Sequence, residues 1–452
     1  MSTPLAHLKP KAVWSAFEEL NAVPRPSKRE EKIQAFAQEI GTSLGLPTDT
    51  DEVGNVRILK SASPGMEAAP TVVIQAHLDM VCQKNEGTEH DFDHDGINMF
   101  IDNGWVKAHG TTLGADNGMG VAIAIATLRS TEMVHPALEV LFTSDEETGM
   151  TGALGLKEGW ITGKYLLNID TEDDNELTIG CAGGIDVTAA MPTSYRPAPV
   201  PNPLAYKILI KGLTGGHSGM DIHLGRGNAN LLMGRLLRQL ESSACVLIHS
   251  MEGGNLRNAI PRECKATVVM GEAHATQLEN EFSAYVVQLK KEFSSTDPNL
   301  EITLQKIGAH DGLVLAAEQQ AQLLAVVAGC PAGILRMNPE VNGLVQTSNN
   351  LAKIHISQVG AEILCLTRSS SESEKMDAAQ RIASILGLAG FTTTFAGSYP
   401  GWEPSPGGTL ASLMRNTYLD LFEDEPQINA CHAGLECGII GERCPGMEMI
   451  SF

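Results

Sequence analysis

The sequence predicts an α/β protein: a three-layer domain around a mixed sheet, with an α+β domain inserted into it. Three observations carry this prediction. Short apolar strands alternate with helical segments over the first 170 residues, a proline-dense stretch follows, and a different order of elements begins after it. At 452 residues the chain is also longer than one ordinary hydrophobic core supports.

The first part of the chain alternates between strand and helix patterns. Residues 71–76, 138–143 and 165–169 have the continuous apolar character of buried strands. Residues 119–128 are small and apolar throughout, which suits a buried helix, and residues 12–43 predict two helices separated by prolines. Strands that alternate with helices favour a sheet covered by helices on both faces.

Prolines gather between residues 192 and 203 and mark a change in organisation. Such a stretch cannot pair as a central strand, because proline has no N–H to donate, so we interpret it as a linker. We place the domain boundary just before it. Residues 1–186 and 398–452 then form the first domain, and residues 187–397 form the inserted one.

The inserted segment follows the order β-α-β-β-α-β, which is typical of a ferredoxin-like unit. A weaker copy of that order comes next, so we expect two ferredoxin-like subdomains. From about residue 400 the chain returns to the first sheet with one helix and one strand. The predicted elements are 204–211, 226–242, 245–250, 263–270, 275–294, 299–305, 315–329, 351–357, 361–368, 371–387, 391–396, 409–422 and 447–452.

Composition excludes several classes of partner. The 54 acidic and 32 basic residues leave a formal net charge of −22, which argues against binding to nucleic acid or to anionic membranes. No apolar stretch has the length of a signal peptide or a membrane span. Nine scattered cysteines without a paired CxxC pattern suit reduced thiols. We therefore expect a cytoplasmic protein.

Acidic and imidazole side chains follow several of the predicted strands directly. In open α/β sheets, ligands gather at the carboxyl ends of the strands. Each residue alone has a more common structural explanation, such as a loop histidine, a solvated turn or a helix cap. Together they favour a metal site, because imidazole and carboxylate bind zinc and a bridging carboxylate can hold two ions. The residues are His77, Asp79, Asp116, Glu146, Glu147 and Asp170.

Several of these residues lie in stretches that resemble the M20 family of di-zinc peptidases, and the resemblance extends over essentially the whole chain. It implies a catalytic domain that holds two divalent metal ions, zinc first and cobalt or manganese as alternatives, and a lid domain. The similar stretches are Gln-Ala-His-Leu-Asp-Met-Val (75–81), Thr-Leu-Gly-Ala-Asp-Asn-Gly-Met-Gly (112–120), Thr-Ser-Asp-Glu-Glu-Thr-Gly (143–149), Asn-Ile-Asp-Thr-Glu (168–172) and Gly-Gly-His-Ser-Gly (215–219).

The resemblance implies a ligand set. His77 and Asp170 would bind one zinc, Glu147 would bind the other, and Asp116 would bridge both. The peptide bond between Asp116 and Asn117 is expected to be cis. In the family a further histidine ligand of the second zinc follows the strand that here reads Met-Ile-Ser-Phe. This sequence stops before that position, and we expect an omitted tail to carry it.

Two further residues of the first domain receive roles from the resemblance. Asp79 would orient His77 through a hydrogen bond. Glu146 would be the general base, which takes a proton from the attacking water and passes it to the leaving amine. Adjacent residues at the end of a strand point in different directions, so Glu146 and Glu147 can divide proton transfer and metal binding between them.

The remaining candidates lie in or after the inserted domain. By resemblance, His217 would stabilise the oxyanion, either within one chain or across a dimer. Arg368 and Asn258 would hold the C-terminal carboxylate of the substrate, for which a guanidinium is well shaped. His432 and Glu436 would belong to a late loop that contacts the free amino group of the substrate.

The resemblance implies hydrolysis of short peptides, with dipeptides of the Xaa-His type favoured, by a homodimer. Two alternatives stay open. The chain could be an aminoacylase or carboxypeptidase-like enzyme on the same fold, or a binding protein on an inactivated hydrolase fold.

Overall fold

In a computed structural model of the chain, which describes residue 5, residues 7–310 and residues 312–452, the polypeptide divides into two units. Unit 1 contains Met1–Cys181, Trp402–Ala430 and Leu435–Phe452, and unit 2 contains Ala182–Gly401 and Cys431–Gly434. In the described part of the chain, no helix combines the length and the apolar character that crossing a membrane requires.

Unit 1 is built on an eight-stranded mixed sheet in the order β1-β2-β6-β3-β7-β21-β8-β20. Its four central strands, β6, β3, β7 and β21, pair in parallel, and antiparallel partners continue the sheet on either side. The strands are β1 (Thr48–Thr50), β2 (Val56–Lys60), β3 (Val72–His77), β6 (Leu138–Thr143), β7 (Tyr165–Asn168), β8 (Glu176–Cys181), β20 (Gln427–Cys431) and β21 (Glu448–Ser451).

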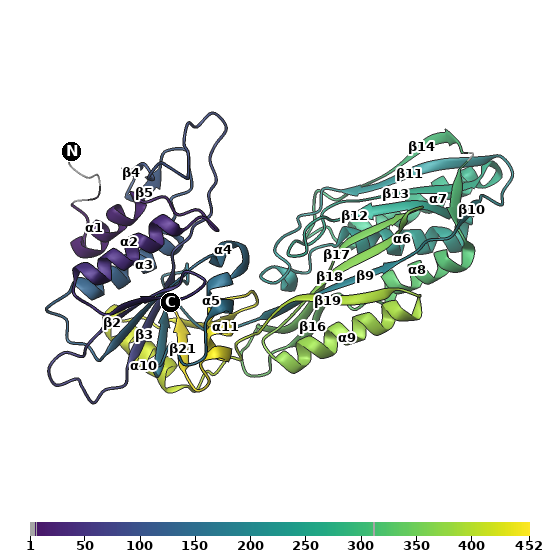
Figure 1. The fold of residues 1–452 in the computed structure, drawn as a ribbon. Coiled ribbons are helices and arrows are strands. Elements are labelled where there is room, and N and C mark those ends of the chain that lie inside the picture. Colours follow the sequence, from purple (N-terminus) through teal and green to yellow (C-terminus); the bar gives the residue numbers. More distant parts are fainter. Residues whose placement is uncertain (1–4, 6, 311) are drawn as a thin grey trace. The chain divides into compact units, whose positions relative to one another are not determined.

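Helices cover both faces of this sheet. Helices α1 (Lys11–Asn21), α2 (Glu31–Ser43) and α3 (Ala115–Arg129) pack on one face, where Phe17 and Ile125 join strand residues such as Val140 in one apolar core. Helix α10 (Thr409–Phe422) packs on the other face with Ile179 and Ile450 (Figure 1). The smaller elements are α4 (Glu146–Gly149), α5 (Thr151–Gly155), α11 (Glu436–Arg443) and the hairpin of β4 (Met99–Asp102) and β5 (Trp105–Ala108).

Unit 2 is built on one nine-stranded sheet in the order β14-β11-β13-β12-β17-β18-β9-β19, with β16 also paired to β17. A separate pair is formed by β10 (Tyr195–Pro197) and β15 (Leu313–Leu315). The strands of the large sheet are β9 (Gly183–Met191), β11 (Pro203–Lys211), β12 (Leu247–Gly253), β13 (Cys264–Gly271), β14 (Glu301–Ala309), β16 (Gly333–Met337), β17 (Val345–Ser357), β18 (Gly360–Ser369) and β19 (Thr392–Tyr399).

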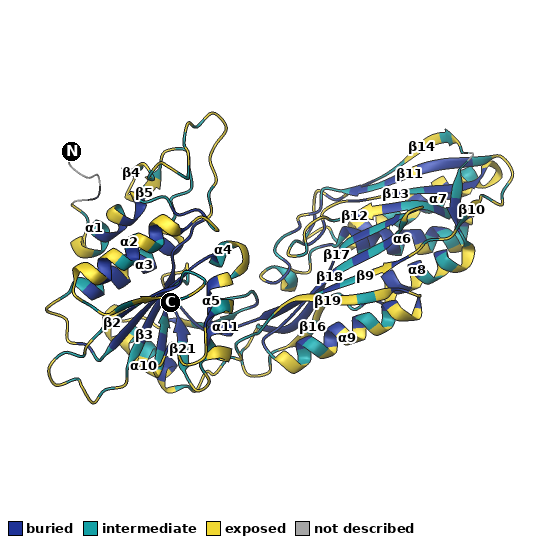
Figure 2. Ribbon diagram, in the orientation of Figure 1, coloured by how far each residue is buried: buried dark blue, intermediate teal, exposed yellow. Residues whose placement is uncertain are grey.

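The helices of unit 2 supply the apolar core that the sheet needs. Side chains such as Leu236 of α6 and Ile382 of α9 pack with Ile208, Val268 and Ile363 of the strands. Figure 2 shows the corresponding pattern, with buried residues along the strands and on the inner sides of the helices. The helices are α6 (Ala229–Ala244), α7 (Ala275–Glu292), α8 (Ala317–Gly329) and α9 (Glu372–Leu388), with 3-10 turns at Ile222–Leu224 and Glu272–His274.

The predicted α/β fold class is confirmed, with some differences in arrangement. The first half of unit 2 has the predicted order from β11 to β14, but both halves share one sheet instead of forming two separate ones. The expected boundary at residue 186 falls inside β9, because this strand pairs with β18 and β19 ahead of the proline-rich stretch.

Candidate metal centre and anion site

Three ligand atoms converge at the carboxyl ends of the parallel strands of unit 1. His77 is the last residue of β3, Asp170 follows β7, and Asp116 lies in the first turn of α3. The Nε2 atom of His77 lies 3.0 Å from Asp116 Oδ1 and 3.4 Å from Asp170 Oδ1. One ligand atom from each of the three lies within 4.8 Å of the others.

The ring of His77 is held in the orientation that metal binding needs. Its Nδ1 lies 3.2 Å from Asp79 Oδ1 and keeps a proton there, while Nε2 faces the two aspartates, so a bound cation would take the place of a proton on Nε2. An unprotonated imidazole nitrogen between two carboxylates is a donor set that fits a divalent cation such as zinc. His77, Asp116 and Asp170 therefore form the core of a candidate metal centre.

Asp79 also fixes the start of α4. Both its oxygens are fully buried, and they accept the backbone N–H groups of Glu146 (3.0 Å) and Glu147 (3.2 Å) and the hydroxyl of Ser27 (2.7 Å). Burial raises the pKa of Asp79, but the hydrogen bonds from His77 and Ser27 outweigh it and hold the pKa below its ordinary value. Asp79 thus stays ionised and positions the two glutamates.

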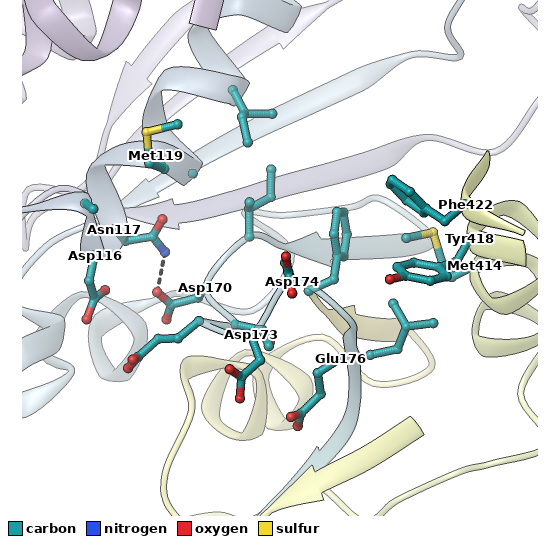
Figure 3. A pocket seen from close by; sticks show the side chains of 18 of the residues that line it. Asp116, Asn117, Met119, Asp170, Asp173, Asp174, Glu176, Met414, Tyr418 and Phe422 are labelled. Atoms are coloured by element: carbon teal, nitrogen blue, oxygen red, sulfur yellow. Dashed lines mark hydrogen bonds between the residues drawn. The ribbon is translucent and has the colours of Figure 1, made fainter. Parts of the chain in front are cut away.

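The peptide bond between Asp116 and Asn117 is cis, which confirms the expectation from the sequence. The side-chain amide of Asn117 donates a hydrogen bond to Asp170 Oδ1, as the dashed line in Figure 3 shows. One short segment therefore supplies the Asp116 carboxylate and also fixes the orientation of Asp170.

The glutamate pair that follows β6 lies beside this group. Glu147 is not part of the three-residue cluster found among the described residues. Burial and the charge of Asp116 raise the pKa of its carboxyl, and the charge of His77 opposes them. Burial raises the pKa of Glu146 to about 9, His77 opposes this, and the carboxylates of Glu436, Asp170 and Glu147 add to it. Burial lowers the pKa of His77, but its aspartate neighbours outweigh this and raise it well above its ordinary value.

Glu436 lies inside unit 1, at the start of α11, with none of its surface exposed. Its Oε2 accepts hydrogen bonds from Thr143 Oγ1 (2.6 Å) and Gln75 Nε2 (2.7 Å). Burial raises the pKa of Glu436 to about 7. In this position Oε2 supports the ends of β3 and β6 from within the fold, while the substrate contact expected of Glu436 stays a prediction.

A cavity of about 710 Å³ borders the metal centre on the side of Asp116 and Asp170 (Figure 3). Met414, Tyr418 and Phe422 form an apolar wall, with the aspartates of the loop after β7 near them. Among the described residues that line it there is neither His77 nor either member of the glutamate pair. Its size alone therefore does not mark it as the place of reaction.

Unit 2 holds a second group of candidate residues around His217 and Arg368. The Nδ1 atom of His217 accepts the backbone N–H groups of Gly219 (3.2 Å) and Met220 (3.0 Å), so the ring proton sits on Nε2. That Nε2 lies 3.4 Å from Nη2 of Arg368. In this tautomer both atoms carry hydrogens, so two N–H donors face each other, and the described residues place no acceptor between them.

Burial and the charge of Arg368 lower the pKa of His217, which keeps the ring neutral near pH 7. The Nε atom of Arg368 is buried and has no hydrogen-bond partner in the described part of the chain. Because unmatched buried donors are costly, the arrangement fits an anionic oxygen, such as a carboxylate, as the missing acceptor.

The neighbours of Arg368 hold it in place. Its Nη1 donates to the hydroxyl of Tyr399 (2.8 Å), and the backbone oxygen of Tyr399 accepts from the buried Lys375 (2.6 Å). His432 lies 2.8 Å from the hydroxyl of Ser348, and burial with the Arg368 charge lowers the pKa of His432 to about 3.

The exposed residue Asn258 belongs to the same region of unit 2, because its backbone oxygen accepts the N–H of Ser218 (2.7 Å). The loop that carries His217 is thereby paired with the loop that carries Asn258, and a backbone bridge joins His217 to Ala259. Three candidates of unit 2, His217, Asn258 and Arg368, thus lie on two adjoining loops and at the end of β18.

Sequence reasoning missed a contribution from the segment between α1 and α2. Arg25 donates to backbone carbonyls next to two of the ligands, Ser27 binds Asp79, and Glu30 Oε1 accepts the N–H of Asp145 (2.6 Å). The only signal in the sequence is a polar run, Arg-Pro-Ser-Lys-Arg-Glu, where a solvated loop is the ordinary interpretation.

In the mixed sheet of unit 1, the ends of the parallel strands bring together a histidine and several carboxylates, an arrangement typical of metal-dependent hydrolases of the α/β class. Comparisons with known proteins agree. Residues 208–297 match the model of a peptidase dimerisation domain of the M20 type. The chain is 40% identical over 447 residues to the cytosol non-specific dipeptidase of Escherichia coli (strain K12), covering 99% of this chain and 92% of that protein.

Solved structures give the same result. The aminoacylhistidine dipeptidase of Vibrio alginolyticus is similar with a TM-score of 0.92 and 42% identity, over 100% of this chain and 92% of that one. The aminopeptidase PepT of Bacillus cereus shares the fold at a TM-score of 0.53 and 15% identity, over 98% of this chain and 89% of that one. The chain belongs to the M20 peptidase family.

Proposed function

We propose that the protein is a dipeptidase that hydrolyses dipeptides, those of the Xaa-His type among them, with two divalent metal ions. The observation that carries the proposal is the convergence of His77 Nε2, Asp116 and Asp170 at one sheet edge, with Glu146 beside them. The two relatives named above as dipeptidases, at 40% and 42% identity over nearly the whole chain, support the choice of substrate.

Each ligand has a place in this proposal. His77 and Asp170 hold one ion, Glu147 holds the other, and Asp116 bridges both, with zinc as the first choice and cobalt or manganese as alternatives. Such ions would act as Lewis acids toward the scissile carbonyl and would activate a water molecule. Asp79 keeps His77 in its metal-binding tautomer.

Glu146 is the proposed general base. It would take a proton from the attacking water and give it to the leaving amine. Its carboxylate is held next to the ligand group by the hydrogen bond from its backbone N–H to Asp79, and the positive charge of bound cations would favour its ionised, proton-accepting form.

Unit 2 would recognise the charged end of the peptide. The donors of His217 and Arg368 suit anionic oxygen acceptors. From the family resemblance we assign Arg368, with Asn258, to the substrate carboxylate and His217 to the carbonyl oxygen that becomes negative. His432 would border the same site, and Glu436 would support the strand ends. The dimerisation-domain match supports a homodimer.

A substrate panel with a matched pair of variants tests the proposal. The wild type, loaded with zinc, should cleave dipeptides and should cleave N-acyl amino acids and longer peptides poorly. Glu146→Gln should lose about 10²–10⁴-fold in kcat, the range of general acid–base catalysis, with unchanged metal content. The control Glu132→Gln changes an exposed glutamate and should keep wild-type rates. Retained turnover in Glu146→Gln would remove the general-base role, and a preference for N-acyl amino acids would change the reaction assigned.

A further inference from the structure

A buried arginine joins the two loops that carry metal ligands. Arg25 lies in the segment after α1, and only 2% of its surface is exposed. Its Nη1 donates to the backbone oxygens of Leu78 (3.2 Å) and Asp79 (3.1 Å), immediately after His77. Its Nη2 donates to the backbone oxygen of Gly114, two residues before Asp116.

The arginine is itself held from outside these loops. The side chain of Asn21, at the end of α1, accepts a hydrogen bond from Nη2 (3.2 Å). The backbone oxygen of Arg25 accepts the N–H of Met80 (3.2 Å), and Pro26 forms a parallel bridge with Met80. Helix α1 therefore anchors a guanidinium that connects the end of β3 to the entry of α3.

The loop before α3 is shaped to fit this guanidinium. A Cβ atom at Gly114 would lie 2.3 Å from Arg25 Nη2, and one at Gly118 would lie 2.7 Å from it. Gly114 also has a φ of +68°, a left-handed conformation that favours glycine. Two glycines of the Gly-Ala-Asp-Asn-Gly stretch thus allow the backbone to approach Arg25.

A buried charge is costly unless something in the fold uses it. All four acceptors of Arg25 are neutral oxygens, three from the backbone and one from an amide, so no single ion pair explains the arginine. Burial lowers the pKa of Arg25 to about 10, and the charges of Asp79, Asp116 and Glu147 oppose this by raising it. The side chain therefore remains a cation near pH 7. A fixed positive charge behind several carboxylates also reduces their mutual repulsion.

We propose that Arg25 is a positioning residue that sets the distance between the His77 loop and the Asp116 loop, so that the metal ligands face one another before a metal binds. Arg25 neither ligates the metal nor touches the substrate. The inference rests on the metal-binding part of the proposed function and not on the identity of the substrate.

The test measures zinc affinity by competition with a chromophoric zinc chelator. Arg25→Lys should bind zinc about 10-fold more weakly than the wild type, and Arg25→Met about 100-fold, the range seen when partners of metal ligands are removed. Asn21→Ala, which loosens the anchor only, should show a smaller loss of a few-fold. At saturating zinc, the kcat of Arg25→Lys should return to within about twofold of wild type, because the residue acts through the ligands.

Arg57→Met is the matched control. Arg57 is a half-buried arginine of unit 1 that, like Arg25, donates to a backbone carbonyl, that of Trp160. It pairs with Asp49 on a strand that carries no ligand. It should lower the melting temperature and leave zinc affinity unchanged. Wild-type zinc affinity in Arg25→Lys and Asn21→Ala, or an equal loss in Arg57→Met, would overturn the inference. Because zinc affinity needs no substrate, this result is independent of whether dipeptides are cleaved.

Discussion

Replacing Asp79 by asparagine should weaken metal binding far more than the loss of one negative charge at a distance would. The wild-type carboxylate accepts four hydrogen bonds, from His77 Nδ1, Ser27 Oγ and the backbone N–H groups of Glu146 and Glu147. Asparagine offers one oxygen and one NH₂ group in the same volume. The Ser27 hydroxyl can reverse and accept from the NH₂, but the backbone N–H of Glu147 on the same side cannot.

The magnitude follows from these contacts. One buried N–H left without an acceptor costs about 1–3 kcal/mol, and each bond that loses its charge assistance weakens by about 1 kcal/mol. Relief of repulsion among the remaining carboxylates offsets part of this in the protein alone. It does not offset the loss of metal affinity, for which we expect about 10–100-fold.

Unfolding in urea at several zinc concentrations measures this directly. A 10–100-fold weaker site lowers the stabilisation conferred by a given free zinc concentration by about 1.4–2.7 kcal/mol. The variant should therefore need about 10–100-fold more free zinc to reach the same stability, while the circular dichroism of the folded state stays the same. If Asp79→Asn gains as much stability from zinc as the wild type does, the assigned role of Asp79 is wrong.

Two further outcomes are expected. Tyr399→Phe removes the acceptor of Arg368 Nη1 and should raise KM for a dipeptide about 5–30-fold with little change in kcat. The control Tyr195→Phe loses a comparable hydrogen bond from its hydroxyl to the backbone oxygen of His249 and should leave KM and kcat unchanged. Equal effects of the two variants would argue against a role for Tyr399 at the site. Burial raises the pKa of Glu30 from 4.5 to about 7, so the folded state favours the protonated carboxyl. The free energy of unfolding should therefore fall as the pH rises from 4.5 to 7, by at most about 3 kcal/mol. Glu30→Gln keeps an acceptor for Asp145 and should remove this decline in urea unfolding between pH 5 and pH 8; a decline of the same slope would assign it to another group.

Much of the fold follows from local patterns. The strands β3 and β6 and the helix α10 occupy almost the predicted residues, because continuous apolar runs and amphipathic periodicity report burial directly. The hairpin of β4 and β5 was not predicted, since its strands have four residues each and none of them is buried. Its sequence is Met-Phe-Ile-Asp-Asn-Gly-Trp-Val-Lys-Ala. The start of β9 was also missed, because its two glycines and small side chains resemble a loop.

The candidate site shows the same division. Strand ends predicted the meeting of His77, Asp116 and Asp170, because topology alone brings those positions to one edge. Arg25 could not be found in this way, since its burial depends on α1 and on two loops distant in sequence. Glu436 was placed in a loop because nothing local shows that α11 begins there and turns the carboxylate inward.

The position of β21 has a consequence for how the protein is made. This strand lies between β7 and β8 in the sheet of unit 1, although about 280 residues of chain separate it from β7 and about 270 from β8. The ribosome therefore synthesises almost all of unit 2 before β21, so the sheet of unit 1 is incomplete until the end of synthesis. Unit 2 can complete its folding while unit 1 still lacks the strand between β7 and β8. A nascent chain arrested after residue 440 should accordingly present a protease-resistant middle and a digestible beginning.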